Sequence, residues 1–337
     1  GPDAYRNLPD LIGLAESGQR VSDTEFRSWE HYEDVPAVRE KAPTAFVTVQ
    51  RGCDYRCTFC IVPQTRGPER SRRLADVVRE IAELVEQGTT EVTLLGQTVN
   101  SYHDGQYDFA DLLHAAGEVD GLRRIRFTSP YPTDFTPRVI AAMANTPAVC
   151  EHVHLPVQSG SNAVLKRMLR RYTRERYIDV VAQLRAAIPG ITLSTDIIVG
   201  FPGETEDDFE QTLRLVDEVG FDDAYTFQYS VREGTPAVRL KNHIANPVAA
   251  DRLRRLIEKV RLNVRRKNIA RVGETHEVLV ERPAKRGGLM LGRTRTNHLV
   301  LLDLPPGSAG EYHTVQLTGT TGSTFIGSVV LPALAVL

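Results

Sequence analysis

The sequence has 337 residues, 41% hydrophobic and 25% charged, so it is long enough to bury a sizeable core and add a small second domain. No stretch approaches the ~18 consecutive apolar residues of a membrane span, and no signal-peptide pattern opens the chain, so we expect a cytoplasmic protein with no membrane partner. The formal net charge of -2 excludes the overall basic excess that marks many nucleic-acid-binding proteins.

Residues 1–43 show little regular pattern and carry nine acidic against five basic residues. "DLIGLAESG" (10–18) is a candidate helix, whereas "VSDTEFRSWEHYEDVP" (21–36) has the composition of an extended linker. We predict that this segment is the end of a domain that begins upstream, followed by a linker.

From Thr44 onward, short runs rich in β-branched residues alternate with longer amphipathic runs. "TAFVTVQ" (44–50) predicts a strand, and "LADVVREIAELVEQG" (74–88) spaces apolar residues on one helical face and ends at Gly88. Five more strands are expected at "EVTLLG" (91–96), "RRIRFTS" (123–129), "CEHVHLP" (150–156), "ITLSTDIIVG" (191–200) and "DAYTFQYS" (223–230). We therefore predict an α/β fold for residues 44–271, with six βα units in a parallel barrel or part of one.

A polar segment rich in Gly or Pro follows each predicted strand, and the first of these segments is "RGCDYRCTFC" (51–60). Active sites of βα barrels are built at the carboxyl ends of the strands, so the six segments are expected to converge on one mouth. The first segment holds Cys53, Cys57 and Cys60, and the fourth cysteine of the chain is Cys150. A structural zinc site closes with four Cys or His ligands, and no His lies within twenty residues of these three cysteines. The loop predicts a metal group held by three thiolates, with an incomplete zinc site as the alternative, and Cys150 is expected to be a core thiol among apolar neighbours.

The pattern changes beyond Val272 to period-2 segments separated by Gly and Pro, which predicts a small all-β module over residues 272–337, a five-stranded barrel. Two basic runs precede it: residues 251–271 carry nine Lys or Arg against two acids, and residues 166–176 carry six against one. Such faces can follow a phosphate backbone, and the alternative is a solvated helix face.

The cysteine loop, with Phe59 directly before Cys60, resembles the CxxxCxxC motif of radical S-adenosylmethionine (SAM) enzymes. In that motif three thiolates hold a [4Fe–4S] cluster and its fourth iron binds SAM. Five further segments resemble the tRNA methylthiotransferases of this class: "LLGQTVNSY", "FTSPYPTDF", "HVHLPVQSGSNAVLKRM", "STDIIVGFPGETEDDF" and "YSVREGTPA". The module over residues 272–337 resembles their RNA-binding TRAM domain. The resemblance implies a partial (β/α)6 TIM-like radical SAM barrel followed by a TRAM barrel.

The same resemblance implies attachment of a methylthio group to C2 of N6-isopentenyladenosine beside the tRNA anticodon, with an external electron donor. Members of the family carry an upstream domain whose three cysteines hold a second [4Fe–4S] cluster, but no cysteine precedes Cys53 here. The resemblance therefore implies a chain that lacks that domain, cleaves SAM and binds RNA without completing the transfer.

Site residues follow from the matched motifs and from side-chain chemistry. Cys53, Cys57 and Cys60 are the expected cluster ligands. The expected cofactor contacts are Phe59, Gly96, Gln97, Ser129, Gln158, Asp196, Ile198 and Gly200. The expected RNA contacts are Arg66, Arg70, Arg72, Lys166, Arg265, Arg266, Lys267, Arg293 and Arg295.

These assignments have alternatives. Guanidinium groups at the mouth suit phosphates or the SAM carboxylate, whereas Arg66, Arg70, Arg72 and the neighbouring Arg73 can instead form ion pairs with Glu69 and Asp76. Gln158 and Asp196 can satisfy polar groups of the barrel. His152 and His154 share one strand face, and packing or hydrogen bonding is expected for both rather than metal ligation.

Two other functions remain open at the level of sequence. The first is methylthiolation of an aspartate in a ribosomal protein, which an assay of both substrates would distinguish. The second is an RNA-binding module with a structural metal loop, for which zinc without acid-labile sulfide would be the evidence.

Overall fold

The computed structural model describes residues 1, 3–27, 29–30, 41–285 and 287–330. Its helices of five or more residues are α1 (Leu8–Glu16), α2 (Val62–Arg66), α3 (Leu74–Glu86), α4 (Phe109–Gly117), α5 (Pro137–Asn145), α6 (Asn162–Arg167), α7 (Arg174–Ala187), α8 (Glu206–Val219) and α9 (Asn246–Ala270). The strands before α9 are β1 (Thr44–Thr48), β2 (Gln50–Arg51), β3 (Arg70–Ser71), β4 (Glu91–Leu95), β5 (Arg124–Phe127), β6 (His152–His154), β7 (Thr192–Val199) and β8 (Asp223–Gln228). The strands after α9 are β9 (Thr275–Pro283), β10 (Met290–Thr294), β11 (Leu299–Leu302), β12 (Tyr312–Thr320) and β13 (Phe325–Val329).

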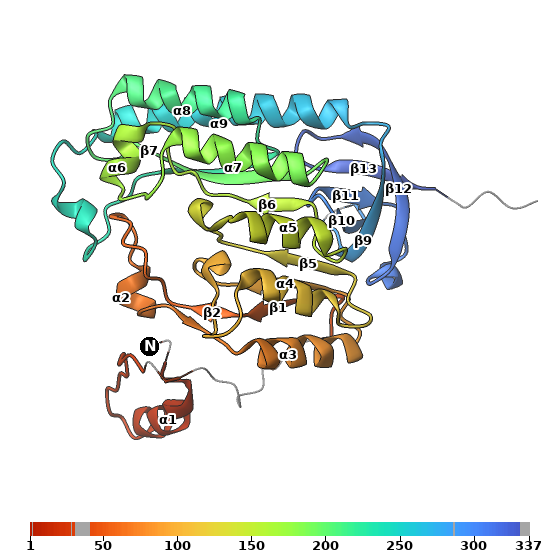
Figure 1. The fold of residues 1–337 in the computed structure, drawn as a ribbon, viewed down its shortest axis with the longest axis horizontal. Coiled ribbons are helices and arrows are strands. Elements are labelled where there is room, and N and C mark those ends of the chain that lie inside the picture. The colour runs from red at the N-terminus through yellow and green to blue at the C-terminus, as the bar shows by residue number, and fades with distance from the viewer. Residues whose placement is uncertain (2, 28, 31–40, 286, 331–337) are drawn as a thin grey trace, which may run out of the picture.

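Six parallel strands form an open barrel; the sequence pattern predicts a barrel or part of one, and the family resemblance implies the partial form. β1, β4 and β5 pair in one sheet and β6, β7 and β8 in another. A parallel bridge from Ile125 to Val149 links the two sheets between β5 and β6. Among the described strands no pairing joins β1 to β8, so the barrel stays open there. The helices lie outside the curved sheet (Figure 1), which confirms the partial TIM-like fold.

Local sequence explains where these helices pack and stop. On α3 the apolar residues Val77, Ile81 and Leu84 are buried in the main core, as their spacing predicts. α8 starts with a capping box between Thr205 and Asp208, and it ends at Gly220, whose φ of +60° suits a residue without a side chain.

The second domain is a closed five-stranded barrel, as predicted, with strand order β10-β11-β13-β12-β9. Its own small core contains Val278, Met290, Val300, Val315 and Phe325. The pair β11 and β13 is parallel and the other pairs are antiparallel.

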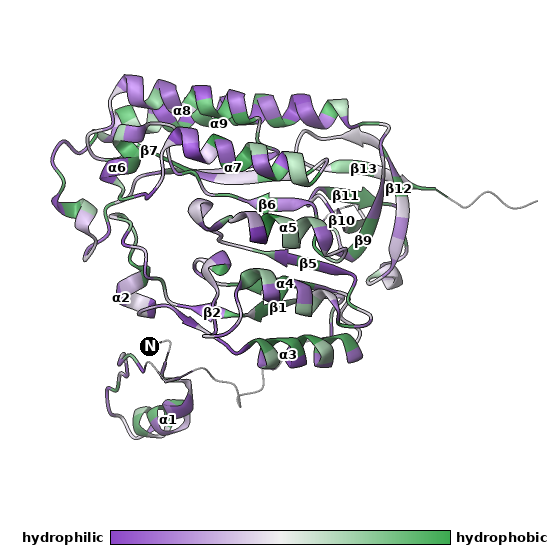
Figure 2. Ribbon diagram, viewed as in Figure 1, coloured by the Kyte–Doolittle hydropathy of each residue, from purple (hydrophilic) through white to green (hydrophobic). Residues whose placement is uncertain are grey.

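The small barrel lies against the amino-terminal ends of the large barrel's strands, away from the cysteine loop (Figure 1). Arg124 and Arg126 make β5 one of the most hydrophilic strands of the sheet (Figure 2). Both guanidinium groups donate to backbone oxygens of the small barrel, and Arg126 also pairs with Glu91 at 2.9 Å. Charged side chains at the start of β5 therefore join the two domains.

Near the amino terminus, α1 covers most of the candidate helix at 10–18. Of the predicted linker, residues 21–27 have no helix or strand, and residues 31–36 lie outside the described residues. Among the described helices none is both long and apolar enough to cross a membrane.

Candidate active site

The cysteine loop lies at the carboxyl end of β1, where the barrel fold predicts the active site. Its entry is set by Gly52, whose φ is +75° and where a Cβ atom would lie 1.9 Å from the carbonyl oxygen of Pro68. The loop is then tied to its surroundings by backbone hydrogen bonds from Cys53 to Gly67 (3.2 Å) and from Thr58 to Met168 (3.0 Å). The cysteines are thus fixed by segments on both sides of the loop.

The three thiols are suited to bind a soft metal ion or an iron–sulfur cluster, and they are largely shielded from water. Cys53 and Cys57 are buried and Cys60 is partly buried. Burial raises the pKa of the Cys53 thiol to about 11 and also raises the pKa of Cys60, so both thiols are protonated at neutral pH until a metal displaces the proton. The described residues contain no group of three ligands converging on a single metal ion. A cluster does not need such convergence, because each thiolate binds a different iron.

Two buried glutamine oxygens beyond the loop lack hydrogen-bond partners among the described residues. They are Oε1 of Gln97, after β4, and Oε1 of Gln158, after β6. An unsatisfied buried acceptor is costly, so a donor from a bound group suits each position. Gln158 and Ser129 also have positive φ angles, of 69° and 58°, which is uncommon away from glycine and is often found at functional sites.

Two predicted glycines allow close backbone packing. A Cβ atom on Gly96 would lie 2.7 Å from Oε1 of Gln50, and one on Gly200, with φ +73°, would lie 2.6 Å from the Cβ of Ala249. Ile198 packs in a small cluster with Phe59 and Phe201. Phe59 therefore supports the loop from the side of β7, and its contact with a cofactor stays a prediction.

A cavity of about 580 Å³ occupies the interior of the open barrel. Its lining includes Ser129 and Asp196 from the large barrel and Arg293 from the small one. His152 and His154 line it too, and both contact the Ser194 hydroxyl, at 3.2 and 2.9 Å. Burial holds the pKa of His152 well below its usual value, so this ring is neutral. Hydrogen bonding of both histidines agrees with the sequence expectation.

The mouth arginines divide into two groups. Arg70 pairs with Asp3 at 3.1 Å, and Arg72 pairs with Glu80 at 2.5 Å. These partners differ from the Glu69 and Asp76 considered above. Arg66 and Arg73 are exposed. Asp3 is distant in sequence, which is why local charge spacing does not reveal the pairing.

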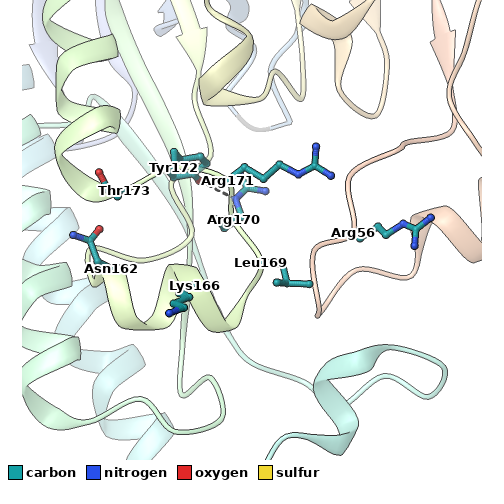
Figure 3. A pocket seen from close by; sticks show the side chains of 8 residues that line it. All are labelled: Arg56, Asn162, Lys166, Leu169, Arg170, Arg171, Tyr172 and Thr173. Carbon is teal, nitrogen blue, oxygen red and sulfur yellow. Dashed lines mark hydrogen bonds between the residues drawn. The ribbon is translucent and has the colours of Figure 1, made fainter.

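The predicted RNA contacts are spread over the molecule. Lys166 is exposed in a groove of about 610 Å³ beside the cysteine loop (Figure 3). Arg265 and Arg266 are exposed on α9, whereas the Lys267 ammonium pairs with Asp222 at 2.6 Å. On the small barrel, Arg293 pairs with Glu281 and Arg295 with Glu151. Arg295 thereby contributes to the contact between domains, and its role in RNA binding stays a prediction.

Cys150 is buried, as expected, but its surroundings include charged groups besides the expected apolar neighbours. Its thiol lies near the charges of Arg126 and Glu91, and burial raises its pKa. The reason is that β5 turns its arginines toward the small barrel at the level of Cys150.

Several positioning residues had no signal in the sequence. Gln50, fully buried after β1, accepts from the Thr98 amide (3.2 Å) and donates to Ser101 (2.9 Å), which shapes the segment that contains Gly96. Glu69 accepts from the hydroxyls of the same Thr98 and Ser101. A lone glutamine after a strand does not stand out in a sequence, so the positioning role of these residues is visible only from their contacts in the structure.

Comparison with known proteins agrees with this geometry. Residues 47–216 match the family model described as the radical SAM superfamily, so the open barrel and its cysteine loop define a radical SAM protein. Enzymes of this class use SAM together with an iron–sulfur cluster. The chain is 50% identical over 291 residues to tRNA-2-methylthio-N6-dimethylallyladenosine synthase of Moorella thermoacetica, covering 85% of this chain and 65% of that protein. It is 45% identical over 333 residues to the synthase of the same name from Thermus thermophilus, covering 98% and 70%.

The chain therefore belongs to the family of tRNA-2-methylthio-N6-dimethylallyladenosine synthases, and it spans about two thirds of the length of these relatives. Among solved structures, coproporphyrinogen III oxidase from Escherichia coli superposes with a TM-score of 0.50 at 14% identity. That match covers 86% of this chain and 73% of the other, and it supports the fold alone.

Proposed function

We propose that this chain binds one [4Fe–4S] cluster through Cys53, Cys57 and Cys60, binds SAM beside it, and acts on tRNA. The complete reaction is attachment of a methylthio group to C2 of N6-isopentenyladenosine next to the anticodon, and this 337-residue chain supplies its SAM cleavage and tRNA binding. The observation that carries this proposal is the three-cysteine loop at the carboxyl end of β1 in an open parallel barrel. The name of the relatives supports tRNA, rather than a ribosomal protein, as the substrate.

The residues around the loop fit this pair of cofactors. When bound, the cluster and SAM supply a one-electron cleavage that releases the 5′-deoxyadenosyl radical. The free oxygens of Gln97 and Gln158 can accept hydrogen bonds from amino groups of SAM. Gly96 and Gly200 have no side chain, so neighbouring groups can pack directly against their backbone. The apolar side chains of Phe59, Phe201 and Ile198 keep water away from the loop.

The interior cavity is our proposed site for the target base. Ser129 and Asp196 supply an oxygen-rich wall that can orient the base and the bound cofactor. The Tyr225 ring, 5.7 Å from the ring of His154, supplies an aromatic face at the open side of the barrel. An aromatic face suits stacking of an unpaired base, as in other proteins that take a nucleotide out of its stack.

Two exposed basic surfaces can hold the surrounding RNA. The first surface is the groove beside the cysteine loop, which is lined by Arg56 from that loop and by Lys166 and Arg171 from the segment before α7 (Figure 3). The second surface contains Arg265 and Arg266 on α9. Both present guanidinium or ammonium groups to solvent, as phosphate contacts require.

The test is an anaerobic turnover assay with the 337-residue chain. After reconstitution with iron and sulfide, protein, reductant, SAM and prenylated tRNA are mixed, and both products are analysed by chromatography. We expect 5′-deoxyadenosine without methylthiolated tRNA, because no cysteine precedes Cys53 to hold the second cluster that the family uses for sulfur. Cys57→Ala is the negative control.

Absence of 5′-deoxyadenosine from protein verified to carry the cluster would refute radical chemistry. Methylthiolated adenosine would refute the single-cluster part of the proposal. Zinc without acid-labile sulfide would favour a structural metal loop in an RNA-binding module.

A further inference from the structure

Arg170 lies directly beside the cysteine loop, and the sequence motifs give it no role. It follows α6, and Leu169, with a φ of +55°, turns the chain just before it. One guanidinium nitrogen of Arg170, Nη1, lies 3.4 Å from Sγ of Cys57 and donates to it. This contact joins residues 113 positions apart in the sequence.

The other donors of the same guanidinium hold it in that orientation. Nε donates to the hydroxyl of Tyr172 at 2.8 Å (Figure 3), and Nη2 donates to the carbonyl oxygen of Pro156 at 3.1 Å. The ring of Tyr131 lies 4.3 Å from the guanidinium carbon. Three hydrogen bonds and an aromatic face therefore fix the group.

The backbone around Arg170 is fixed to the cysteine loop as well. The Thr58 amide donates to the carbonyl oxygen of Met168 at 3.0 Å, and the Thr58 hydroxyl donates to that of Arg167 at 2.9 Å. These bonds hold the backbone that leads to Arg170 against the cysteine loop. The contact is a built part of the site rather than a chance approach of a long side chain.

The charge of Arg170 has no carboxylate partner within ion-pair distance in the described part of the chain. A partly buried cation without an anion is unfavourable, so an anionic group belongs next to it. A cysteine thiolate that ligates an iron–sulfur cluster supplies that anion. Hydrogen bonds to ligand sulfurs and nearby charge are among the factors that set cluster reduction potentials.

We propose that Arg170 is a positioning residue that raises the reduction potential of the cluster by donating to the Cys57 thiolate. The inference rests on the proposed function, because it requires the cluster at Cys53, Cys57 and Cys60. Reduction adds one negative charge, and a fixed cation with an N–H aimed at sulfur stabilises the more negative state. Reduction by the external donor is thereby made easier.

Arg171 supplies a matched control. It is the next residue, carries the same charge and is exposed, and its guanidinium lies 5.2 Å from the ring of Tyr55. Comparing the two positions separates a directed hydrogen bond from a general effect of positive charge near the loop.

The experiment measures the midpoint potential of the reconstituted chain by anaerobic spectroelectrochemistry, with iron and sulfide counted for every variant. We expect Arg170→Met to lower the ratio of reduced to oxidised cluster about tenfold at a given applied potential, about 59 mV for a one-electron couple. Arg170→Lys, which keeps the charge, should recover part of the shift. Arg171→Met should shift the potential by less than half as much.

An unchanged midpoint in Arg170→Met would overturn the proposal, and so would an equal shift in Arg171→Met. If Arg170→Met does not retain a full cluster, Arg170→Gln takes its place, and an unchanged midpoint there overturns the proposal equally. Failure of the unsubstituted chain to hold any [4Fe–4S] cluster would instead refute the proposed function.

Discussion

At the scale of single residues, the three cysteines of the loop differ from Cys150 in what surrounds them. Cys53, Cys57 and Cys60 share one loop that neighbouring backbone holds in place. Cys150 lies among the buried charges at the contact between the two domains. The difference predicts that only the loop cysteines affect metal content.

We therefore expect Cys57→Ala to abolish the cluster, because three thiolates are the minimum that anchors a cube with one open iron. Cys150→Ala should keep the full cluster. The measurement is iron and acid-labile sulfide per chain after anaerobic reconstitution, with circular dichroism as a check of folding. A full cluster in Cys57→Ala, or a lost cluster in folded Cys150→Ala, would contradict the ligand assignment.

At the scale of elements, the long helix α9 presents different basic residues to solvent and to the protein. Arg265 and Arg266 are exposed, whereas Lys267 contacts Asp222 and the carbonyl oxygen of Gly220. Of the three residues expected to bind RNA, only Arg265 and Arg266 therefore remain candidates for phosphate contacts. Burial lowers the pKa of Lys267, and the nearby Asp222 carboxylate partly opposes this shift.

Replacing Arg265 and Arg266 by Gln should weaken tRNA binding and reduce the slope of log affinity against log salt by about two, roughly one for each lost phosphate contact. Binding is measured by filter retention over a series of salt concentrations. Arg254→Gln is the control on the same helix, because Arg254 already pairs with Asp251 and Glu258. An unchanged slope in the double variant would remove α9 from the RNA interface.

The small barrel carries a pH-sensitive residue of its own. Burial, aided by the nearby charge of Arg271, lowers the pKa of His298 to about 4, against about 6.5 in an unfolded chain. Between these values the unfolded chain binds a proton that the folded barrel does not. The stability contributed by neutral His298 is therefore fully present above pH 6.5 and is lost as the pH falls toward 4.

The expected loss from this group at pH 5 is about 2 kcal/mol of unfolding free energy relative to pH 7. Urea unfolding at both pH values, followed by circular dichroism, measures it. His298→Gln should show a correspondingly smaller difference between the two pH values. The same difference in the variant would show that another group is responsible.

At the scale of the whole molecule, buried ion pairs within the large barrel hold the two arginines that contact the small barrel. Glu91 pairs with Arg126 at 2.9 Å and with Arg124 at 3.6 Å, and all three side chains are buried. Both arginines also donate to backbone oxygens of the small barrel. Removing the negative charge of Glu91 therefore takes away an ion-pair partner from both buried arginines at the interface.

We expect Glu91→Gln to destabilise the protein by about 3 kcal/mol, in the range for breaking a buried ion pair. Differential scanning calorimetry should show the unfolding of the small barrel separating from that of the large one. The control is Arg79→Gln, which breaks an exposed pair with Asp76 and should cost under about 1 kcal/mol. If both substitutions lowered the stability by the same amount, the Glu91 ion pairs would have no special role at the interface between the domains.

The sequence by itself determined the order of elements, the six βα units, the five-stranded module and the position of the cysteine loop. These features rest on local periods of apolar residues and on spacings within a short segment, both of which are readable without knowledge of distant contacts. The structure alone decided which charged residues are free. Arg70 and Arg72 are paired while Arg66 is exposed, Cys150 lies among charges, and Arg170 meets Cys57 across 113 residues. Pairing depends on which side chains the fold brings within a few ångströms, and the barrel brings together segments from all along the chain, so spacing in the sequence carries no record of it.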